Sequence, residues 1–275
     1  MSAIVTLTSD FGLTDAYVSA MKGAILGINP EAALVDISHS IEPQNISQAA
    51  FVLSTACENF PDGTVHLVVV DPGVGTERKG IILKTPKSCF VAPDNGVLTY
   101  VARAYGQSSE LGPNPSSGSG QRLEAVSLTN KDFWHSPVSA TFHGRDIFAP
   151  VAAHLSLGVP ISEFGDRIPA IQFLPVPGVS RGVDGSLVGS IIHIDRFGNL
   201  ITNIKCEHLT GKPWKMVVEV GQQRIEGLNR TYAEGEGLSA LTGSSDHLEI
   251  AMKEGSASQF LGARVGDEVV LREMV

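Results

Sequence analysis

The sequence predicts an α/β protein, with an N-terminal layered α/β domain that contains a largely parallel sheet and a smaller C-terminal all-β, barrel-like domain. In the first part of the chain, β-rich runs alternate with stretches of helical periodicity, as in strands joined by helical crossovers. Later in the chain, short β-rich runs follow one another across glycine-containing turns. A proline-punctuated connector separates the two patterns, so we expect domains at residues 1–170 and 180–275.

The elements of the N-terminal domain follow from local sequence patterns. Asn45 can cap a helix, because apolar residues recur behind it at helical spacing. Residues 64–70 are nearly all β-branched or apolar, which is typical of a buried central strand. Gly158 would end a helix that starts near Gly144. In chain order we expect strands at 4–8, 33–37, 64–70 and 89–92, and helices at 16–26, from 45 onward and at 144–157.

The connector and the C-terminal domain have a different pattern. Pro169, Pro175 and Pro177 interrupt the chain where the helical periodicity ends. Beyond them we expect short strands at 187–194, 215–220, 247–252 and 268–272. Residues 107–121, within the first domain, are rich in Gly, Ser and Pro, and we expect them to form an exposed loop.

Composition argues against several classes of function. The 275 residues carry a formal net charge of -9 without any basic run, so a nucleic-acid partner is not expected. No apolar run is long enough to cross a bilayer, and the first residues lack the features of a signal peptide. Cys57, Cys89 and Cys206 are far apart in sequence, which argues against a zinc site or a disulfide framework and suits a reducing cytoplasm. We expect a cytoplasmic protein without a bound metal.

Polar residues follow two of the strands expected in the N-terminal domain. Ligands bind at the carboxyl ends of strands in open α/β sheets. Asp10 follows the first strand, where a carboxylate can accept hydrogen bonds from a ribose diol, although Asp10 or Asp15 could instead cap the next helix. Asp71 opens a glycine-rich turn that reaches Arg78 and that matches neither a Walker loop nor a dinucleotide fingerprint. A surface turn with an Asp–Arg pair is the alternative.

Two further clusters lie later in the chain. His143 stands just before an expected helix, where it could be a base, a water-holding group, a metal ligand or a structural hydrogen-bonding group. With Asp146 it could suggest a metal site, but no second set of ligands has convincing spacing. Asp195 opens a turn in which Asn199 could pair with the adenine edge and Phe197 could stack on the ring. A plain turn with Phe197 in the core is the alternative.

Together and in this order, the clusters resemble those of the S-adenosylmethionine hydrolases (hydroxide adenosyltransferases), which are related to fluorinating and chlorinating enzymes that act on the same substrate. The matching stretches are 8–14, 70–78, 92–96, 141–150 and 194–199, extended by Thr231-Tyr232 and 243–257. They span nearly the whole chain, and residues 107–134 match least. The resemblance implies hydrolysis of S-adenosyl-L-methionine to adenosine and L-methionine. It also implies a homotrimer with sites at subunit interfaces, and no cofactor besides the substrate.

The resemblance also implies roles for individual residues. Asp71, Arg78 and His143 would form a triad that holds the attacking water, with Asp71 also contacting the substrate, and Asp10 would bind the ribose hydroxyls. Asn199 would read adenine while Phe197 and Tyr232 pack on its ring. The remaining expected substrate-binding residues are Asp195, near the methionine amino group, and Ser244, Glu249 and Met252, which would line the adenosine or methionine end.

The identity of the nucleophile depends on the triad. The halide-using relatives have an uncharged residue in place of Asp71 and lack the histidine, and Gly243-Ser244-Ser245 stands where the fluorinating branch has Asn-Ser-Arg. A carboxylate beside a bare halide is repulsive, so the sequence favours water. A sulfonium departs as a neutral thioether and needs no general acid, while Asp71 or His143 could take the proton of the water.

Three alternatives remain open at this point. The first is a halide-dependent adenosyl transferase of the chlorinase or fluorinase kind. The second is a non-catalytic protein that binds adenosine or S-adenosylmethionine. The third is a metal-dependent phosphoesterase that uses the aspartates and His143.

Overall fold

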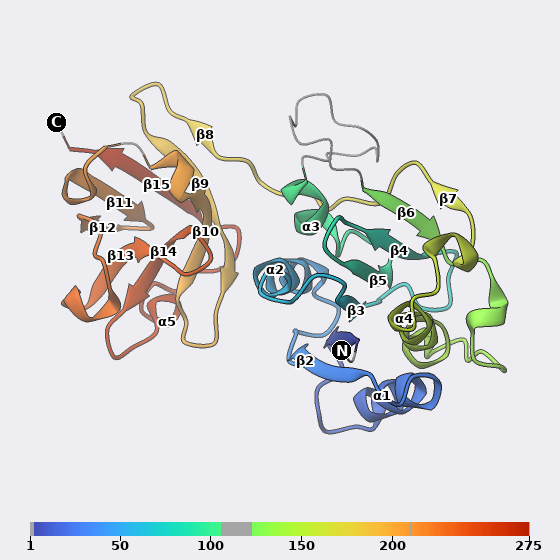
Figure 1. Cartoon of the computed structure of the whole chain (residues 1–275). Coiled ribbons are helices and arrows are strands. Elements are labelled where there is room, and N and C mark those ends of the chain that lie inside the picture. Colours follow the sequence, from blue (N-terminus) through green and yellow to red (C-terminus); the bar gives the residue numbers. More distant parts are fainter. Residues whose placement is uncertain (1–2, 106–122, 210, 275) are drawn as a thin grey trace. The chain divides into compact units, whose positions relative to one another are not determined.

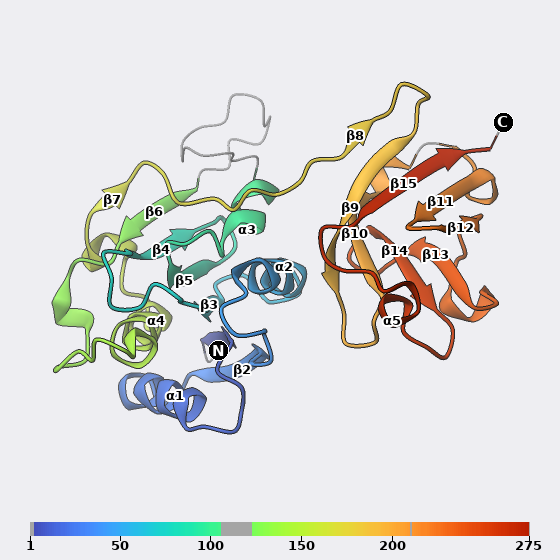
Figure 2. The ribbon, with the colours of Figure 1, turned by 180° about the vertical axis from the view of Figure 1, so that it is seen from behind.

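The computed structural model describes residues 3–105, 123–209 and 211–274 of the chain. The chain divides into two compact units, Met1–Leu174 and Pro175–Val275. Each unit has its own sheet and its own hydrophobic core (Figures 1 and 2). The loop predicted at 107–121 lies outside the described residues. Within the part of the chain that the structure describes, no helix is both long and apolar enough to span a bilayer.

The sheet of the N-terminal unit has the strand order β2-β1-β3-β5-β4-β6-β7. Strands β2, β1, β3 and β5 are parallel neighbours, which confirms the predicted parallel sheet, whereas β4, β6 and β7 extend it by antiparallel pairing. The strands are β1 (Ile4–Ser9), β2 (Ala33–Ser38), β3 (Val65–Val69), β4 (Gly80–Lys84), β5 (Cys89–Pro93), β6 (Glu124–Ser127) and β7 (Arg167–Ile168). The sequence patterns had not pointed to β4, β6 or β7, because these are short strands without a clear alternation of apolar and polar residues.

Helices cover both faces of this sheet. One core contains buried residues of α1 and α4, and a second core contains residues of α2 and α3, so the two helix pairs lie on opposite faces (Figure 1). The helices are α1 (Tyr17–Ile28), α2 (Ile46–Cys57), α3 (Thr99–Ala104), α4 (Ala149–Ser156) and the short 3-10 turns η1 (Lys131–Phe133) and η3 (Ile161–Phe164). Asn45 caps α2 as expected, since its side chain accepts a hydrogen bond from Gln48 N at 2.9 Å.

The helix predicted at 144–157 begins differently from the prediction. Its first turn, η2 (Gly144–Phe148), is a π-helix, and regular α-helix starts only at Ala149. Pro150 follows the π-turn and has no N–H for the carbonyl of Asp146 four residues earlier, which instead accepts from His135 N at 2.7 Å. Such π-turns are frequent at functional sites, and this one directly follows His143.

Strand β3 shows why a β-branched run forms the centre of this sheet. Val65, Leu67 and Val69 point into the core on the α1 and α4 face, and Val68 and Val70 point into the core on the α2 and α3 face. Both faces are therefore apolar, as expected for a parallel strand covered by helices on each side. The first polar residue after it is Asp71.

The C-terminal unit is an antiparallel, barrel-like sheet, which confirms the predicted all-β domain. Its strand order is β12-β11-β15-β9-β10-β14-β13, with β8 paired to β9, and its interior is a single apolar cluster. The strands are β8 (Ser180–Arg181), β9 (Leu187–Ile194), β10 (Leu200–Lys205), β11 (Met216–Val220), β12 (Gln223–Glu226), β13 (Leu238–Thr242), β14 (His247–Met252) and β15 (Glu268–Glu273). The helical turns are η4 (Cys206–His208), η5 (Pro213–Lys215), η6 (Tyr232–Glu234) and α5 (Ala257–Leu261).

Candidate active site

The carboxyl ends of β1, β3 and β5 meet at one edge of the N-terminal sheet. These strands are adjacent and parallel, so the residues that follow them are brought together. Asp10 follows β1 and Asp71 comes shortly after β3. Asn95, which follows β5, donates its side-chain N–H to Val70 O at 2.9 Å and so ties the ends of β3 and β5 together. The pairing of β1, β3 and β5 therefore brings the polar residues at their carboxyl ends to one edge of the sheet, as the sequence predicts.

Asp71 and Arg78 form a two-point ion pair across the glycine-rich turn. Arg78 Nε donates to Asp71 Oδ1 at 3.0 Å, and Arg78 Nη2 donates to Asp71 Oδ2. Both side chains are nearly buried, with 10% and 6% exposed for Arg78 and Asp71. The guanidinium also lies over the ring of Phe148, 5.2 Å from its centroid. The Asp–Arg pair of the surface-turn alternative is thus present, but its two side chains are nearly buried, whereas Thr76 and Glu77 of the same turn are exposed.

Gly75 explains why the turn needs glycine. Its φ is +78°, and a Cβ at this position would lie 2.6 Å from the carbonyl oxygen of Ala140. The turn thus packs directly against the segment that carries His143, and any larger residue would push the two apart.

His143 also contacts the guanidinium of this ion pair. Its Nδ1 lies 3.2 Å from Arg78 Nη2, although 65 residues separate the two in sequence. A guanidinium only donates, so Nδ1 accepts this hydrogen bond and the proton of the neutral ring lies on Nε2. The sequence prediction that Asp71, Arg78 and His143 act together thus has a geometric counterpart, since Arg78 bonds to both of the other residues.

Burial and charge shift both titrating groups of this cluster. Burial raises the pKa of Asp71 above its usual value, although the neighbouring positive charge of Arg78 opposes the shift. Burial, followed by the charge of Arg78, lowers the pKa of His143, although Asp71 and Asp146 oppose this shift. His143 is therefore favoured in its neutral form, and the carboxylate of Asp71 is more basic than a carboxylate in water.

The buried carboxylate of Asp146 organises the segment in front of His143. It accepts hydrogen bonds from Arg145 Nε at 2.6 Å and from Ser139 N at 2.8 Å, and its own carbonyl accepts from His135 N at 2.7 Å. The sequence left open a metal site at His143 and Asp146. Here, both carboxylate oxygens are instead engaged by protein donors. Asp146 therefore has a structural role in this arrangement.

Asp10 lies at the same edge and has a fixed orientation. Its Oδ2 accepts a hydrogen bond from Gln44 N at 2.8 Å. Gln44 has a φ of 66°, which is uncommon for a residue other than glycine. The helix-capping alternative is not seen for Asp10 or Asp15, because α1 starts at Tyr17 without a side-chain cap.

A cavity of about 290 Å³ joins these residues. Asp10, Asp71 and His143 line it together with Gln44, Phe11 and Phe142. The rings of Phe11, Tyr17 and Phe142 contact one another, with centroids 5.2 to 5.9 Å apart. The sequence had assigned no role to Phe11, Gln44 or Phe142. Phe11 and Phe142 stand beside Asp10 and His143 in matched stretches, which was a usable signal, whereas Gln44 had none.

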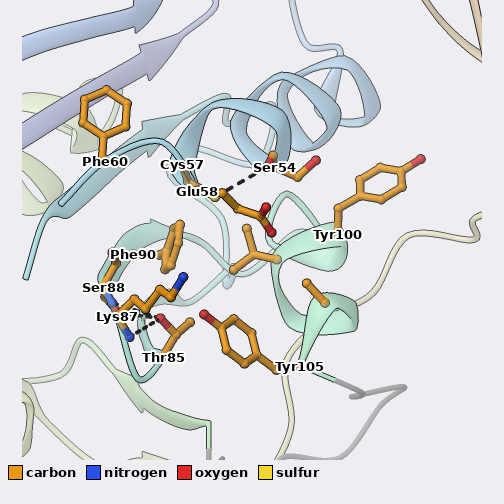
Figure 3. A pocket seen from close by; sticks show the side chains of 12 residues that line it. Ser54, Cys57, Glu58, Phe60, Thr85, Lys87, Ser88, Phe90, Tyr100 and Tyr105 are labelled. Atoms are coloured by element: carbon orange, nitrogen blue, oxygen red, sulfur yellow. Dashed lines mark hydrogen bonds between the residues drawn. The ribbon is translucent and has the colours of Figure 1, made fainter. Parts of the chain in front are cut away.

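Another pocket of the N-terminal unit lies at the amino end of β5 and contains none of the predicted site residues. Ser54 and Cys57 of α2, Lys87 of the turn before β5 and Tyr105 line it (Figure 3). Its volume is only about 60 Å³, enough for one or two water molecules. Burial raises the pKa of Cys57 to about 11, so this thiol is not a reactive nucleophile.

In the C-terminal unit, the turn between β9 and β10 is built around Asp195. Its Oδ1 accepts from Phe197 N at 2.8 Å and from Asn199 N at 2.9 Å, and its Oδ2 accepts from Asn199 Nδ2 at 2.9 Å. The side chain of Phe197 is 77% exposed, so the alternative of a core phenylalanine is wrong. Asn199 is buried, and within the described part of the chain its side chain uses one amide hydrogen, so its Oδ1 and second amide hydrogen can bond to another partner.

A second pair of residues in this unit connects to the same turn. Tyr232 donates its hydroxyl to Glu249 Oε1 at 2.7 Å. Burial raises the pKa of Glu249, and the charge of Asp195 adds to the shift; burial and Glu249 raise the pKa of Tyr232 to about 12. Ser244 is exposed in the turn before β14, and Met252 is the last residue of that strand.

Two family models together cover most of the chain. Residues 5–165 match the SAM hydroxide adenosyltransferase N-terminal domain, and residues 189–270 match the SAM hydroxide adenosyltransferase C-terminal domain. An "(R)-S-adenosyl-L-methionine hydrolase" of Salinispora tropica is 36% identical over 267 residues, which cover 96% of each chain. Its namesake of Thermus thermophilus is 37% identical over 276 residues, or 97% of this chain and 98% of the relative.

The chain is also similar to a fluorinase and to a solved structure. A fluorinase of Actinoplanes sp. is 28% identical over 229 residues, or 73% of this chain and 71% of the relative. A crystal structure of an uncharacterized conserved protein from Thermotoga maritima superposes with a TM-score of 0.86 at 38% identity, covering 98% of this chain and 99% of the other.

Proposed function

The chain belongs to the SAM hydroxide adenosyltransferase family, and on that premise we propose that it hydrolyses S-adenosyl-L-methionine to adenosine and L-methionine. The observation that carries this proposal is the buried unit of Asp71, Arg78 and His143 beside a cavity that Asp10 also lines. Hydrolases at about 36% identity support the reaction.

In this reaction the oxygen of one water forms a bond to C5′ of the adenosyl group while the C5′–S bond breaks. The sulfur takes the bonding electrons and leaves as the neutral thioether of methionine, so no group has to protonate it. The protein must hold one water in line with the C5′–S bond, and positioning of this kind contributes up to about 7–11 kcal/mol in favourable intramolecular cases. The water also loses a proton.

We propose that Asp71 accepts this proton. Nδ1 of His143 is occupied by the hydrogen bond from Arg78, and the remaining ring nitrogen, Nε2, carries a hydrogen. His143 can then donate to the oxygen of the water but cannot accept its proton. Burial raises the basicity of Asp71, and a carboxylate oxygen engaged by one donor still has a free lone pair.

We propose that the adenosyl group is bound by the residues that the family resemblance implies. Asp10 would hold the ribose hydroxyls, Asn199 would pair with adenine, and Phe197 and Tyr232 would pack on the ring. The exposure of Phe197 and the free hydrogen-bonding capacity of Asn199 support these roles. Asp195, Ser244, Glu249 and Met252 would contact the remainder of the substrate. We also propose a homotrimer with sites at subunit interfaces, on the basis of family membership.

The sulfonium is a stereocentre, and we propose that the enzyme acts on the (R) epimer. The names of the hydrolases in Salinispora and Thermus specify (R)-S-adenosyl-L-methionine. Rates measured on the two separated epimers would test this preference. An equal rate for both would contradict it.

The reaction as proposed needs no cofactor, because the leaving group is neutral and the nucleophile is oriented by side chains. Activity that survives extensive treatment with a chelator would support this, and it would contradict the phosphoesterase alternative. A cytoplasmic location is part of the proposal, with three free cysteines in its support.

Halide-dependent adenosyl transfer is the second candidate, because a fluorinase of Actinoplanes is also similar to this chain. Its identity of 28% is lower than that of the hydrolases. A halide placed where the water binds would face the carboxylate of Asp71, and two anions repel each other strongly at short distance in a buried site. High chloride should therefore yield no 5′-chloro-5′-deoxyadenosine.

The decisive experiment is incubation of the protein with S-adenosyl-L-methionine in ¹⁸O-water. We expect one ¹⁸O atom in the 5′-hydroxyl of adenosine and none in methionine, which identifies the substrate, the nucleophile and the bond cleaved. S-adenosyl-L-methionine incubated without protein is the control. Unlabelled adenosine, or a product other than adenosine and methionine, would contradict the proposal.

A further inference from the structure

A series of contacting side chains connects the surface of the N-terminal unit to the loop that carries Asp10. Ser9 and His39 are almost fully buried, and Ser9 Oγ lies 2.7 Å from His39 Nδ1. His39 Nε2 lies 3.0 Å from Asp36 Oδ1, and Asp36 Oδ2 accepts from Lys22 Nζ at 2.7 Å. The hydroxyl of Ser9 can donate to Nδ1, whereas Nε2 lies within ion-pair distance of the carboxylate without the geometry of a hydrogen bond.

The same histidine fixes both ends of the short loop after β1. Ser9 is the last residue of β1, and its Oγ also accepts a hydrogen bond from Phe11 N at 3.4 Å. The carbonyl of His39 accepts from Gly12 N at 2.8 Å. Asp10 and Phe11, which line the cavity, lie between these two attachment points. Strand β1 keeps its register with β3 through Ser9, whereas its register with β2 shifts between Leu7 and Thr8.

We propose that His39 is a positioning residue for Asp10, and that it acts by clamping the loop Ser9–Gly12 through its side chain and its carbonyl. The inference rests on the proposed function, in which Asp10 binds the ribose. Because ribose binding is the same before and during bond cleavage, loosening this clamp should weaken substrate binding and leave the chemical step nearly unchanged.

The chain provides a matched control on the same strand. Thr6 Oγ1 lies 2.8 Å from His66 Nδ1, and both residues are fully buried. This pair has the same chemistry as Ser9 and His39 but joins β1 to β3 inside the sheet, away from the loop. Thr6→Val should therefore cost stability, as loss of a buried hydrogen bond does, without changing substrate binding.

The test compares KM and kcat for S-adenosyl-L-methionine in His39→Leu, His39→Gln, Ser9→Ala and Thr6→Val. For His39→Leu and Ser9→Ala we expect KM to rise about tenfold with kcat within about threefold of the unmodified protein. His39→Gln, which keeps one acceptor and one donor, should recover part of the loss. Thr6→Val should keep the original KM, and thermal unfolding of all four variants identifies any that fail to fold.

The Asp10→Ala background separates positioning from a general structural role. If His39 acts through Asp10, adding His39→Leu to Asp10→Ala should raise KM less than about twofold, because the effects of residues that act together are not additive. An unchanged KM in both His39→Leu and Ser9→Ala, or an equal rise of KM in the Asp10→Ala background, would overturn the proposal. If the unmodified protein releases no adenosine, the proposed function is wrong, and the affinity of the same variants for adenosine then tests the clamp by itself.

Discussion

The guanidinium of Arg78 donates hydrogen bonds and accepts none. Both of its neighbours, Asp71 and His143, must therefore accept from it, which determines where their protons can lie. It leaves Asp71 as an anion that can accept a proton from the other side, and it leaves His143 neutral with its hydrogen on Nε2. A lysine could supply the charge but not the fork that reaches Asp71 at two points. At the scale of single residues, the geometry of one guanidinium therefore supports the proposal that Asp71 is the base.

Replacing Arg78 should affect turnover far more than binding. We expect Arg78→Ala to lower kcat by about 10²- to 10³-fold, because the water loses its orientation, with KM within about threefold. Arg78→Lys should recover only part of the loss. Steady-state kinetics with folding checked by circular dichroism provide the measurement, and a KM that rises as much as kcat falls would count against a role in the chemical step.

The pH dependence of kcat follows from the shifted titrations. Protonating Asp71 removes the base, and protonating His143 places a second positive charge beside Arg78. Activity should thus fall as the pH is lowered. Burial raises the pKa of Asp71 above its usual value of 3.8 and, with Arg78, lowers that of His143, so the midpoint of the acid limb should lie above pH 3.8. A midpoint at or below pH 3.8 would contradict the assignment, and Asp71→Asn should lack most activity at every pH.

At the scale of elements, the hairpin of β13 and β14 depends on a close backbone approach. A Cβ at Gly243 would lie 2.2 Å from Glu249 Oε2. Glu249 is only 5% exposed and its other oxygen is bound to Tyr232. The carboxylate therefore cannot move aside without breaking that hydrogen bond or losing its buried position, so the glycine fixes the side-chain pair.

Gly243→Ala should displace Glu249 and Tyr232 and weaken substrate binding. We expect KM for S-adenosyl-L-methionine to rise about three- to tenfold, and the effect on kcat to be smaller, because the triad belongs to the other unit. Gly178→Ala is the matched control, since a Cβ there meets nothing within 4 Å. Equal kinetics for the two variants would show that the pair does not contribute to binding.

At the scale of the whole molecule, stability is divided between two units with separate cores. The N-terminal unit buries His66 completely, stacked on Phe90 with ring centroids 4.7 Å apart. Burial lowers the pKa of His66 to about 4 from a usual value of 6.5. The imidazole is therefore neutral in the folded protein and becomes charged on unfolding in mildly acidic solution.

This shift predicts a loss of stability in acid. Between pH 6.5 and about 4 the unfolded chain binds a proton at His66 and the folded chain does not. The free energy of unfolding should thus be highest above 6.5 and fall by up to about 3 kcal/mol towards pH 4 from this group. Urea unfolding in a Trp214→Phe background leaves Trp134 to report on the N-terminal unit. The pH slope should be smaller in His66→Phe, and an identical slope would contradict the prediction.

Local sequence patterns were sufficient for the elements with strong periodicity. The buried run that becomes β3, the cap at Asn45 and the change from alternating elements to successive strands all follow from side-chain type and spacing. The short strands β4, β6 and β12 could not be predicted in this way, because what stabilises them is pairing with distant neighbours. The π-helical start before α4 had no sequence signal either.

What the sequence by itself determined is which residue types stand at the ends of strands. Asp10 and Asp71 follow apolar β-runs, so their place at the carboxyl edge was fixed as soon as the strands formed. Only the tertiary structure decided that Arg78 contacts His143, that Gln44 N donates to Asp10, and that His39 contacts Ser9. These contacts join residues far apart in the chain. They depend on strand order and on packing between layers, neither of which is encoded in local spacing.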